Sequence, residues 1–281
     1  MTPATRPLTS DEQSLIDADA VLPFGHFAPN SFQRALVGLA SGSFLRRGLF
    51  RRAITNLVMG SSGAPLDVVF RDCPYRLRGR NNLIEFGILL RPDYNAGDID
   101  FLLDGSKAGD NFVDVGSNIG LYTQPLAKRA ATGTVVAIDA NPLMTRRLAW
   151  NIGASGLSNV QIFACAVSDR DGTGSLNIRK DDIAIVSVEE HDGGPVPVRT
   201  LAAIVDEAGL TSIHGLKIDI EGHEDKALPP FILGAADGLL PKRIVIERTP
   251  NGDYPGCAAA LAARGYVRVG QSRNNSFYLR S

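Results

Sequence analysis

The residues best suited to catalysis or ligand binding lie in one short stretch, Leu216–Glu224, which reads Leu-Lys-Ile-Asp-Ile-Glu-Gly-His-Glu. Successive side chains of a strand point to opposite faces, so Lys217, Asp219 and Glu221 are predicted to share one face. Desolvating three charged groups without partners is costly. The pattern therefore indicates either a lysine–carboxylate network that holds the strand end together or a ligand site. We favour the site, because ligands bind at the carboxyl edge of an α/β sheet.

The same stretch contains groups that can move a proton. His223 has the intrinsic pKa nearest to neutrality, and Asp219 or Glu221 would act as a base if desolvated. Together with Lys217 these are the candidate catalytic residues. His223 is alternatively a surface residue that caps the next helix. No metal site is predicted, since the other histidines are scattered, although Asp219, Glu221 and Glu247 could hold a hard cation.

A second stretch, Asn111–Gly120, is predicted to form a strand followed by a glycine turn and a helix. Its loop reads Asp114-x-Gly116-x-Asn118-x-Gly120, which lacks the third glycine of the dinucleotide fingerprint. An acid at the strand tip would repel a pyrophosphate but would suit a cationic ligand. S-adenosylmethionine is such a ligand, because it carries a sulfonium and an ammonium and no phosphate. The candidate cofactor-binding residues here are Asp114, Gly116, Ser117, Asn118 and Gly120. Asp219 of the first stretch is a candidate for cofactor binding as well as for catalysis.

A third feature follows the β-branched run Thr134–Ile138, which is predicted to be the second strand of the sheet. Asp139 ends it, roughly 20 residues after the glycine loop, where an acid receives ribose hydroxyls. Asn141 is suited to cap the next helix, and the proline after it is suited to the first helical position. We interpret Asp139, Ala140 and Asn141 as cofactor-binding residues; the alternative for Asp139 is a solvated loop acid.

The third predicted strand is Val160–Ala164. In a sheet that binds adenosine, the loop after this strand lies against the base. Ala166 and Val167 are therefore candidates for packing on an adenine ring.

The predicted fold class is α/β: a seven-stranded, mostly parallel sheet of the Rossmann-like kind, with one antiparallel strand and a C-terminal hairpin. A β-hairpin is predicted before it, with strands over Leu66–Arg78 and Leu83–Leu90 around a turn at residues 79–82. Pro229 and Pro230 are expected to break or kink a late helix. The predicted domains are a helical extension over residues 1–65 and a catalytic domain over residues 66–281.

Residues 31–59 are apolar at helical intervals, and their only charged residues are Arg34, Arg46, Arg47, Arg51 and Arg52. A basic amphipathic helix can lie on an anionic membrane surface. A helical cap that packs on the main domain is the interpretation we favour.

Net charge, cysteine content and the absence of long apolar runs limit the kinds of protein that this sequence can be. The formal net charge of the 281 residues is −1, which gives no reason to expect a nucleic-acid partner. The three cysteines, Cys73, Cys165 and Cys257, are predicted to be buried free thiols in a reducing compartment. The N-terminal segment does not resemble a signal peptide, and no apolar run is long enough to span a bilayer. We expect a soluble, cytoplasmic protein.

Together these stretches resemble the FkbM-type methyltransferases, S-adenosylmethionine-dependent enzymes of the class I methyltransferase fold. The resemblance runs through Phe112–Gly120, Ile138–Pro142, Asn151, Ala166–Val167, Val196–Leu201 and Leu216–Glu224. It covers about residues 83–247, and the Lys-Ile-Asp-Ile-Glu-Gly element is its most specific part. Ser117 stands where the family usually has alanine, and Asp139 where glutamate is common; both changes keep the chemistry.

The resemblance implies S-adenosylmethionine as cofactor and a small-molecule or glycan acceptor, because most members methylate hydroxyl groups of sugars or polyketide-type natural products. Two other functions stay open from the residues. An NAD(P)-dependent oxidoreductase fits the Rossmann-like order but not the missing third glycine. A non-catalytic module that docks on membranes or partners fits residues 31–59 but leaves the polar strand end unexplained. The oligomeric state is not predicted.

Overall fold

A computed structural model describes residues 19–43, 48–60, 64–78, 82–178 and 186–280. Residue contacts divide the chain into two compact units. The first comprises residues 1–94, 150–156 and 178–184, and the second comprises residues 95–149, 157–177 and 185–281. The first unit thus contains the predicted extension together with a hairpin and a helix that the sequence analysis assigns to the catalytic domain.

In the first unit, helices α2 (Ser31–Ser41) and α3 (Gly48–Met59) are followed by the hairpin strands β1 (Leu66–Phe70) and β2 (Cys73–Leu77). The two strands pair antiparallel across a turn formed by Arg71 and Asp72. These residues have φ values of 47° and 60°, as a two-residue hairpin turn requires. The predicted hairpin therefore exists, but it closes several residues earlier than expected.

The second predicted strand of that hairpin is wrong, because Leu83–Leu90 forms helix α4. The side chain of Asn82 accepts hydrogen bonds from the backbone amides of Ile84 and Glu85 and so caps this helix. An apolar run of this length fits a strand and a buried helix equally well, and the cap decides between them. Residues 79–81 of the predicted turn lie outside the described residues.

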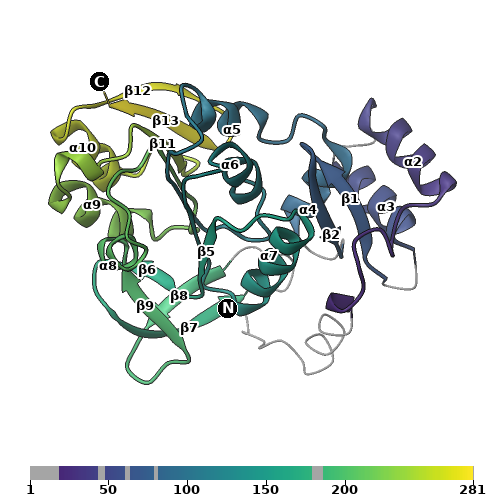
Figure 1. The fold of residues 1–281 in the computed structure, drawn as a ribbon, viewed down its shortest axis with the longest axis horizontal. Helices are drawn as coiled ribbons and strands as arrows, with labels where there is room; N and C mark the ends of the chain where they lie inside the picture. The colour runs from purple at the N-terminus through teal and green to yellow at the C-terminus, as the bar shows by residue number, and fades with distance from the viewer. Residues whose placement is uncertain (1–18, 44–47, 61–63, 79–81, 179–185, 281) are drawn as a thin grey trace. The chain divides into compact units, whose positions relative to one another are not determined.

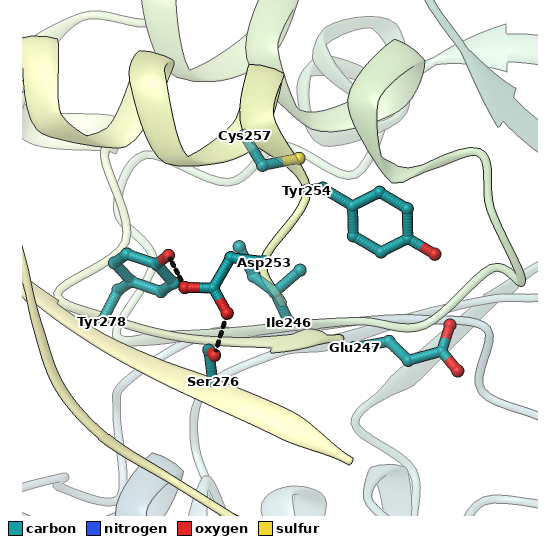
Figure 2. Close-up of a pocket in the computed structure, with 7 residues that line it drawn as sticks. All are labelled: Ile246, Glu247, Asp253, Tyr254, Cys257, Ser276 and Tyr278. Atoms are coloured by element: carbon teal, nitrogen blue, oxygen red, sulfur yellow. Dashed lines mark hydrogen bonds between the residues drawn. The ribbon is translucent and has the colours of Figure 1, made fainter. Parts of the chain in front are cut away.

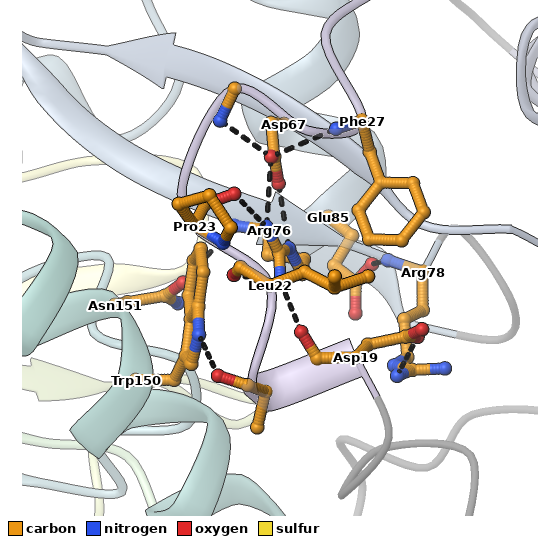
Figure 3. A network of polar contacts seen from close by, with 12 residues as sticks. Asp19, Leu22, Pro23, Phe27, Asp67, Arg76, Arg78, Glu85, Trp150 and Asn151 are labelled. Carbon is orange, nitrogen blue, oxygen red and sulfur yellow. Dashed lines mark hydrogen bonds and ion pairs between the residues drawn. The ribbon is translucent and has the colours of Figure 1, made fainter.

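A buried ion pair organises the first unit (Figure 3). The Arg76 Nε lies 2.7 Å from the Asp67 Oδ1, and both side chains are almost fully buried. Asp67 also accepts hydrogen bonds from the backbone amides of Gly25 and Phe27. The Arg76 guanidinium lies over the Trp150 ring, 3.8 Å from its centroid. These contacts fix the segment before α2 against the hairpin.

The second unit is built on a seven-stranded sheet in the order β12-β13-β11-β10-β3-β4-β5. Figure 1 labels β12, β13, β11 and β5 of this sheet. Strands β3, β4, β5, β10 and β11 run parallel, and β13 pairs antiparallel with both β11 and β12. The bounds of the strands are β3 (Phe112–Val115), β4 (Val135–Ile138), β5 (Val160–Phe163), β10 (Gly215–Ile218), β11 (Arg243–Glu247), β12 (Tyr266–Gln271) and β13 (Asn275–Arg280). This confirms a mostly parallel α/β sheet.

Helices cover both faces of this sheet. Their bounds are α5 (Ala96–Leu103), α6 (Thr123–Arg129), α7 (Pro142–Ala154), α8 (Leu201–Glu207), α9 (Glu224–Gly234) and α10 (Pro255–Ala263), with a 3₁₀ turn, η2, at Asp237–Leu239. Apolar residues of α8, α9 and α10 share one core with Val113, Val115, Leu216 and Ile218 of the central strands. Helices α5 and α6 pack against β3, β4, β10 and β11. Because side chains alternate, Asp114 and Lys217 point to the face opposite that core.

Two further features complete the second unit. Strands β6 (Ala166–Ser168), β7 (Gly172–Ile178), β8 (Val186–Glu190) and β9 (Val196–Thr200) form a smaller sheet in the order β6-β9-β7-β8. Helix α9 continues through Pro229 and Pro230, so these prolines do not break it, and the predicted alternative of a kink stays a prediction. Leu228 and Phe231, on either side of the proline pair, are buried in the core, and this packing keeps the helix in place.

The structure also bears on the cysteines and on membrane-spanning segments. Cys73, Cys165 and Cys257 are free and buried, as expected. Among the described residues, no helix is long and apolar enough to span a membrane.

Candidate active site

The candidate site begins at the tips of the neighbouring strands β3 and β10, where Asp114 and Lys217 are paired in register. The Lys217 Nζ lies 3.9 Å from the Asp114 Oδ1 and 3.5 Å from the Asp219 Oδ2. It also donates a 3.1 Å hydrogen bond to the carbonyl oxygen of Gly116. The predicted lysine–carboxylate network therefore exists, and it fastens the end of β10 to the glycine loop.

The charges in this network balance one another. Burial lowers the pKa of the Lys217 ammonium, but the carboxylates of Asp219 and Asp114 outweigh this effect and leave the pKa above its ordinary value. Burial raises the pKa of Asp114, while Lys217 and the Thr123 hydroxyl, which donates to its Oδ2 at 2.5 Å, oppose the rise. The Lys217 ammonium also lies 5.1 Å from the centroid of the Tyr122 ring. Lys217 is therefore a buried cation held in one position.

The backbone N–H groups of the glycine loop are already used within the protein. Gly116 and Ser117 donate to the carbonyl of Ile138, Asn118 donates to Asp139, Ile119 donates to the side chain of Asn118, and Gly120 donates to the carbonyl of Ser117. A pyrophosphate-binding loop must instead leave such groups free to point at the ligand. The loop consequently offers no amide cradle for a dinucleotide phosphate.

Both glycines of the loop are required by its geometry. Gly116 has a φ of 79°, and a Cβ atom there would lie 1.9 Å from the carbonyl oxygen of Asp219. Gly120 has a φ of 95°, and a Cβ atom there would lie 2.6 Å from the Leu148 Cδ1. The first glycine therefore lets the loop contact the turn after β10, and the second lets it pack against α7.

Asp139 is placed at the end of β4 as predicted, and it organises the loop from the other side. Its Oδ2 accepts from the backbone amide of Asn118, and its Oδ1 accepts from that of Asn141, both at 2.8 Å. Burial raises the pKa of Asp139 to about 6, although these two hydrogen bonds lower it. Asn141 also caps α7, since its side chain accepts from the amide of Leu143.

After β10, the chain turns sharply and brings Glu221 out of the strand. Glu221 has a φ of 54° and is exposed, so the expectation that it shares a strand face with Lys217 and Asp219 is wrong. The strand ends at Ile218, and the period of two ends with it. Glu224 holds this turn: its carboxylate accepts from the backbone amides of Ile220 at 2.6 Å and Gly222 at 2.9 Å.

The turn brings two carboxyl groups to a third one at the end of β11. Carboxyl oxygens of Asp219, Glu221 and Glu247 lie within 4.8 Å of one another. Burial raises the pKa of Glu247 to about 9, and the nearby charges of Asp219 and Glu221 add to the rise. Three acidic groups so close together favour a bound proton or cation. We refer to these three residues as the carboxylate cluster.

A narrow hollow adjoins the cluster, lined by residues of β11, β13, α10 and the segment before α10 (Figure 2). In it, Asp253 accepts hydrogen bonds from Ser276 and from Tyr278. Burial raises the pKa of the Tyr254 phenol well above its ordinary value, and the nearby carboxylate of Glu224 adds to the rise. The Tyr254 hydroxyl therefore stays neutral.

Comparison with known proteins now places the chain in a family. The description "Methyltransferase FkbM domain" matches residues 114–274, which is more than half of the chain. The chain belongs to this family. It is an S-adenosylmethionine-dependent methyltransferase. The matched residues include Asp114, Asp139, Lys217 and the carboxylate cluster.

Several solved structures are similar to this chain at low sequence identity, and no curated protein matches the sequence. The crystal structure of M. jannaschii TYW2 in complex with AdoMet has a TM-score of 0.43 and 14% identity, over 79% of this chain and 89% of that one. A SAM-dependent methyltransferase from Agrobacterium tumefaciens has a TM-score of 0.45 and 11% identity, over 78% and 70% of the two chains. Precorrin-6y C5,15-methyltransferase from Geobacter metallireducens has a TM-score of 0.41 and 12% identity, over 67% and 87%.

The residues at the strand ends fit the cofactor of the family. S-adenosylmethionine presents an ammonium, a sulfonium and ribose hydroxyls, all of which prefer acceptors to donors. The loop has no free amide cradle, while Asp114, Asp139 and Asp219 supply carboxylates around it. One oxygen of Asp114, Oδ1, is buried and accepts no hydrogen bond among the described residues. This acceptor-rich edge suits the methyl donor better than it suits NAD.

The other predicted site residues are distributed as follows. His223 is half-buried at the position before α9, and its side chain makes no capping hydrogen bond there. Ala140 is half-buried between Asp139 and Asn141. Ala166 and Val167 lie in β6 with their side chains buried in two different apolar clusters. Contact of these two residues with adenine stays a prediction, as does the ribose contact of Asp139.

Three residues of the site, Glu224, Thr123 and Tyr254, are not among the residues predicted from the sequence. Glu224 is fully buried and holds the turn, whereas Thr123 supports Asp114 from the first position of α6. A weak signal for Glu224 was present, because an acid in the first turn of a helix often bonds backbone amides just before it. Nothing in the local sequence indicates that Tyr254 meets Glu224, since the two lie on different elements.

Proposed function

We propose that this methyltransferase transfers its methyl group to a hydroxyl group of a small-molecule or glycan acceptor, either a sugar or a polyketide-type natural product. The observation that carries the proposal is the carboxylate cluster at the edge of the sheet. An alcohol has a pKa far above neutrality, so its oxygen reacts well only if a base takes its proton as the new bond forms. The cluster offers carboxylates for this purpose next to the predicted cofactor loop.

The cofactor supplies an electrophilic methyl group when it is bound. The residues of the protein then hold the cofactor and the acceptor in place for the transfer. The loop from Gly116 to Gly120 would hold the methionine portion, and Asp139 would accept the ribose hydroxyls. Asp219 is the carboxylate best placed to accept the acceptor's proton, because its side chain is one-third exposed and lies 3.5 Å from the Lys217 ammonium. Holding donor and acceptor in line supplies a large part of the rate.

The members of the cluster differ in their proton content. With its pKa raised to about 9, Glu247 holds a proton at neutral pH. It can therefore donate a hydrogen bond to a neighbouring carboxylate or to the acceptor. Glu221 is exposed and can contact an acceptor that approaches from solvent. His223 stays a second candidate base by its intrinsic pKa.

Two measurements test the function in turn. Titration calorimetry with S-adenosylhomocysteine and then with NAD first establishes the ligand, and binding of the former only is expected. Mass spectrometry then follows methyl addition to a panel of methyl glycosides, nucleotide sugars, glycans and macrolides. The proposal is wrong if the protein methylates only amines, thiols or carbon atoms in matched panels.

Variants then test the site. Asp219→Asn is expected to lower kcat by about 10²- to 10⁴-fold, the usual contribution of a general base, while the affinity for S-adenosylhomocysteine falls by a much smaller factor. Asp206→Asn, an exposed acid on α8, is the matched control and is expected to leave kcat unchanged. Wild-type kcat in Asp219→Asn would remove Asp219 as the base and direct attention to His223.

A further inference from the structure

Helices α2 and α3 of the first unit repeat one sequence pattern and expose the same positions of it. Residues 32–39 read Phe-Gln-Arg-Ala-Leu-Val-Gly-Leu, and residues 50–57 read Phe-Arg-Arg-Ala-Ile-Thr-Asn-Leu. In both, the phenylalanine and the leucine at the two ends of the pattern are exposed. The exposed fractions are 61% for Phe32, 71% for Leu39, 55% for Phe50 and 55% for Leu57.

The helical period places each pair on one face, because residues seven apart differ by nearly two full turns. The residue after each leucine, Ala40 in α2 and Val58 in α3, is fully buried. The two helices pack against each other, and the Gln33 Nε2 donates a 2.6 Å hydrogen bond to the carbonyl of Val58. Each helix thus already buries one face within the first unit and still exposes an apolar row. We call Phe32, Leu39, Phe50 and Leu57 the apolar rows.

The charged side chains of the segment that contains α2 and α3 are all positive. No aspartate or glutamate occurs between Asp19 and Asp67, whereas five arginines occur there. The segment therefore carries +5, and because the whole chain carries −1, the remainder carries −6. Arg34 is exposed on α2 within its copy of the pattern. Arg46 and Arg47 lie outside the described residues, and the side chain of Arg52 is not described, so these three arginines contribute to the charge through sequence alone.

The apolar rows and the positive charge together indicate which kind of binding partner covers this surface. A second copy of the same surface would cover the apolar rows, but it would bring two segments of +5 together. A nucleic acid would neutralise the arginines, but it would leave four large apolar side chains in water. An anionic lipid bilayer satisfies both features, since its headgroups attract arginines and its acyl boundary takes up phenylalanine and leucine.

We propose that the surface formed by α2 and α3 docks this methyltransferase on an anionic membrane, with the apolar rows inserted at the headgroup–acyl boundary. The docking is peripheral and reversible, because two short helices with four inserting side chains bury little apolar area. It concerns residues remote in sequence from the FkbM domain match at 114–274 and does not depend on the identity of the acceptor. A membrane-borne acceptor would profit from it, but docking is testable without one.

The experiment is co-sedimentation of the full-length protein with vesicles. Vesicles of phosphatidylcholine alone and of phosphatidylcholine with phosphatidylglycerol are compared at low and high salt. Binding is expected only to the phosphatidylglycerol vesicles, and salt is expected to weaken it. Each arginine near such a surface strengthens binding by roughly fivefold. Arg34→Glu/Arg52→Glu is therefore expected to reduce the partition coefficient by more than about tenfold.

The apolar rows are tested by Phe32→Ser/Leu39→Ser and by Phe50→Ser/Leu57→Ser. Each pair is expected to reduce the partition coefficient by about tenfold or more, because inserted apolar area is lost. Leu233→Ser/Val267→Ser is the matched apolar control, since these side chains are 55% and 61% exposed in the second unit. Lys128→Glu/Arg146→Glu is the matched charge control on exposed positions. Both controls are expected to bind as wild type does.

Several outcomes would overturn the proposal. One is the absence of wild-type binding to phosphatidylglycerol vesicles, and another is unchanged binding by both serine pairs. If the serine pairs instead convert a dimer into a monomer in light scattering, the occupant is a second copy of the chain. Binding of S-adenosylhomocysteine, measured in parallel, is expected to be unchanged in every variant, and it separates failure of docking from failure of the enzyme.

Discussion

The carboxylate of Glu224 accepts a 2.6 Å hydrogen bond from the backbone amide of Ile220, four residues earlier in the chain. Its second oxygen accepts from Gly222 at 2.9 Å, so the two contacts straddle Glu221 with its φ of 54°. A non-glycine residue in this conformation persists only where the surroundings over-determine it. Glu224 is therefore a positioning residue that sets where the side chains of Asp219 and Glu221 point.

Glu224→Gln tests this role. One oxygen becomes an NH₂ group, which cannot accept, so one backbone amide of the turn loses its partner. Leaving a buried donor unsatisfied costs about 1–3 kcal/mol. We expect the melting temperature to fall and kcat to fall by about tenfold or more, while the affinity for S-adenosylhomocysteine changes little. Glu189→Gln, at an exposed position, is the control. A drop in stability with unchanged kcat would make Glu224 a structural residue only.

The Gly116–Asp219 contact leads to a second prediction. A methyl group at Gly116 would lie 1.9 Å from the Asp219 carbonyl oxygen, and the φ of 79° is unfavourable for alanine. Gly116→Ala is expected to push the loop away from the turn and to weaken S-adenosylhomocysteine binding by more than about tenfold. Gly109→Ala is the matched control, because its Cβ would meet only the Thr132 Oγ1 at 3.6 Å. Equal affinities in the two variants, measured by calorimetry, would contradict the prediction.

The strand ends of this fold can be predicted from sequence because their signals are local. Phe112, Val113 and Val115 around Asp114, and the β-branched run before Asp139, indicate buried parallel strands. The acid within the first strand and the acid after the second mark the carboxyl edge. The cap at Asn141 is equally local. The helix over Leu83–Leu90 is not, because eight mostly apolar residues satisfy either period and only the side chain of Asn82 decides between them.

The rest of the site depends on contacts between distant elements. The place of Glu247 in the cluster follows from the pairing of β10 with β11 and from the sharp turn at Glu221. Period-two counting could not foresee that turn, since glutamate seldom adopts a positive φ. The role of Glu224 likewise needs the turn to exist first. Chemistry at the strand ends was thus predictable, whereas its arrangement in the loops was not.

Asp139 gives a prediction about pH. Its folded-state pKa is raised to about 6 from 3.8, so the carboxylate becomes ionised in the folded protein only as the pH rises through about 6. The ionised form accepts hydrogen bonds better from ribose hydroxyls. We therefore expect S-adenosylhomocysteine to bind more tightly as the pH rises from about 5 to about 7. Asp139→Asn is expected to bind more weakly and to lose this pH dependence. The same slope in both proteins, measured by calorimetry, would remove Asp139 from the ribose site.

The raised pKa of Glu247 leads to a prediction about how stability depends on pH. Its pKa is raised from 4.5 in the unfolded chain to about 9 in the folded protein, so the folded state holds one more proton between these values. The free energy of unfolding must then decrease as the pH rises across this window, because ionising Glu247 beside Asp219 and Glu221 is unfavourable. Glu247→Gln removes the ionisable group and keeps its shape. The variant is expected to gain about 1 kcal/mol or more over wild type between about pH 5 and about pH 9.

Denaturant unfolding at several pH values measures this difference, with Glu189→Gln as control. Chelation distinguishes the two ways in which the carboxylate cluster can be neutralised. If the cluster is held by a proton, EDTA leaves both the stability difference and the methyl-transfer rate unchanged, and this is the result we expect. A loss of activity in EDTA that Mg²⁺ restores would instead assign a divalent cation to Asp219, Glu221 and Glu247, since such cations prefer carboxylate oxygens. Stability of the wild-type protein that is independent of pH across the window would contradict the raised pKa itself.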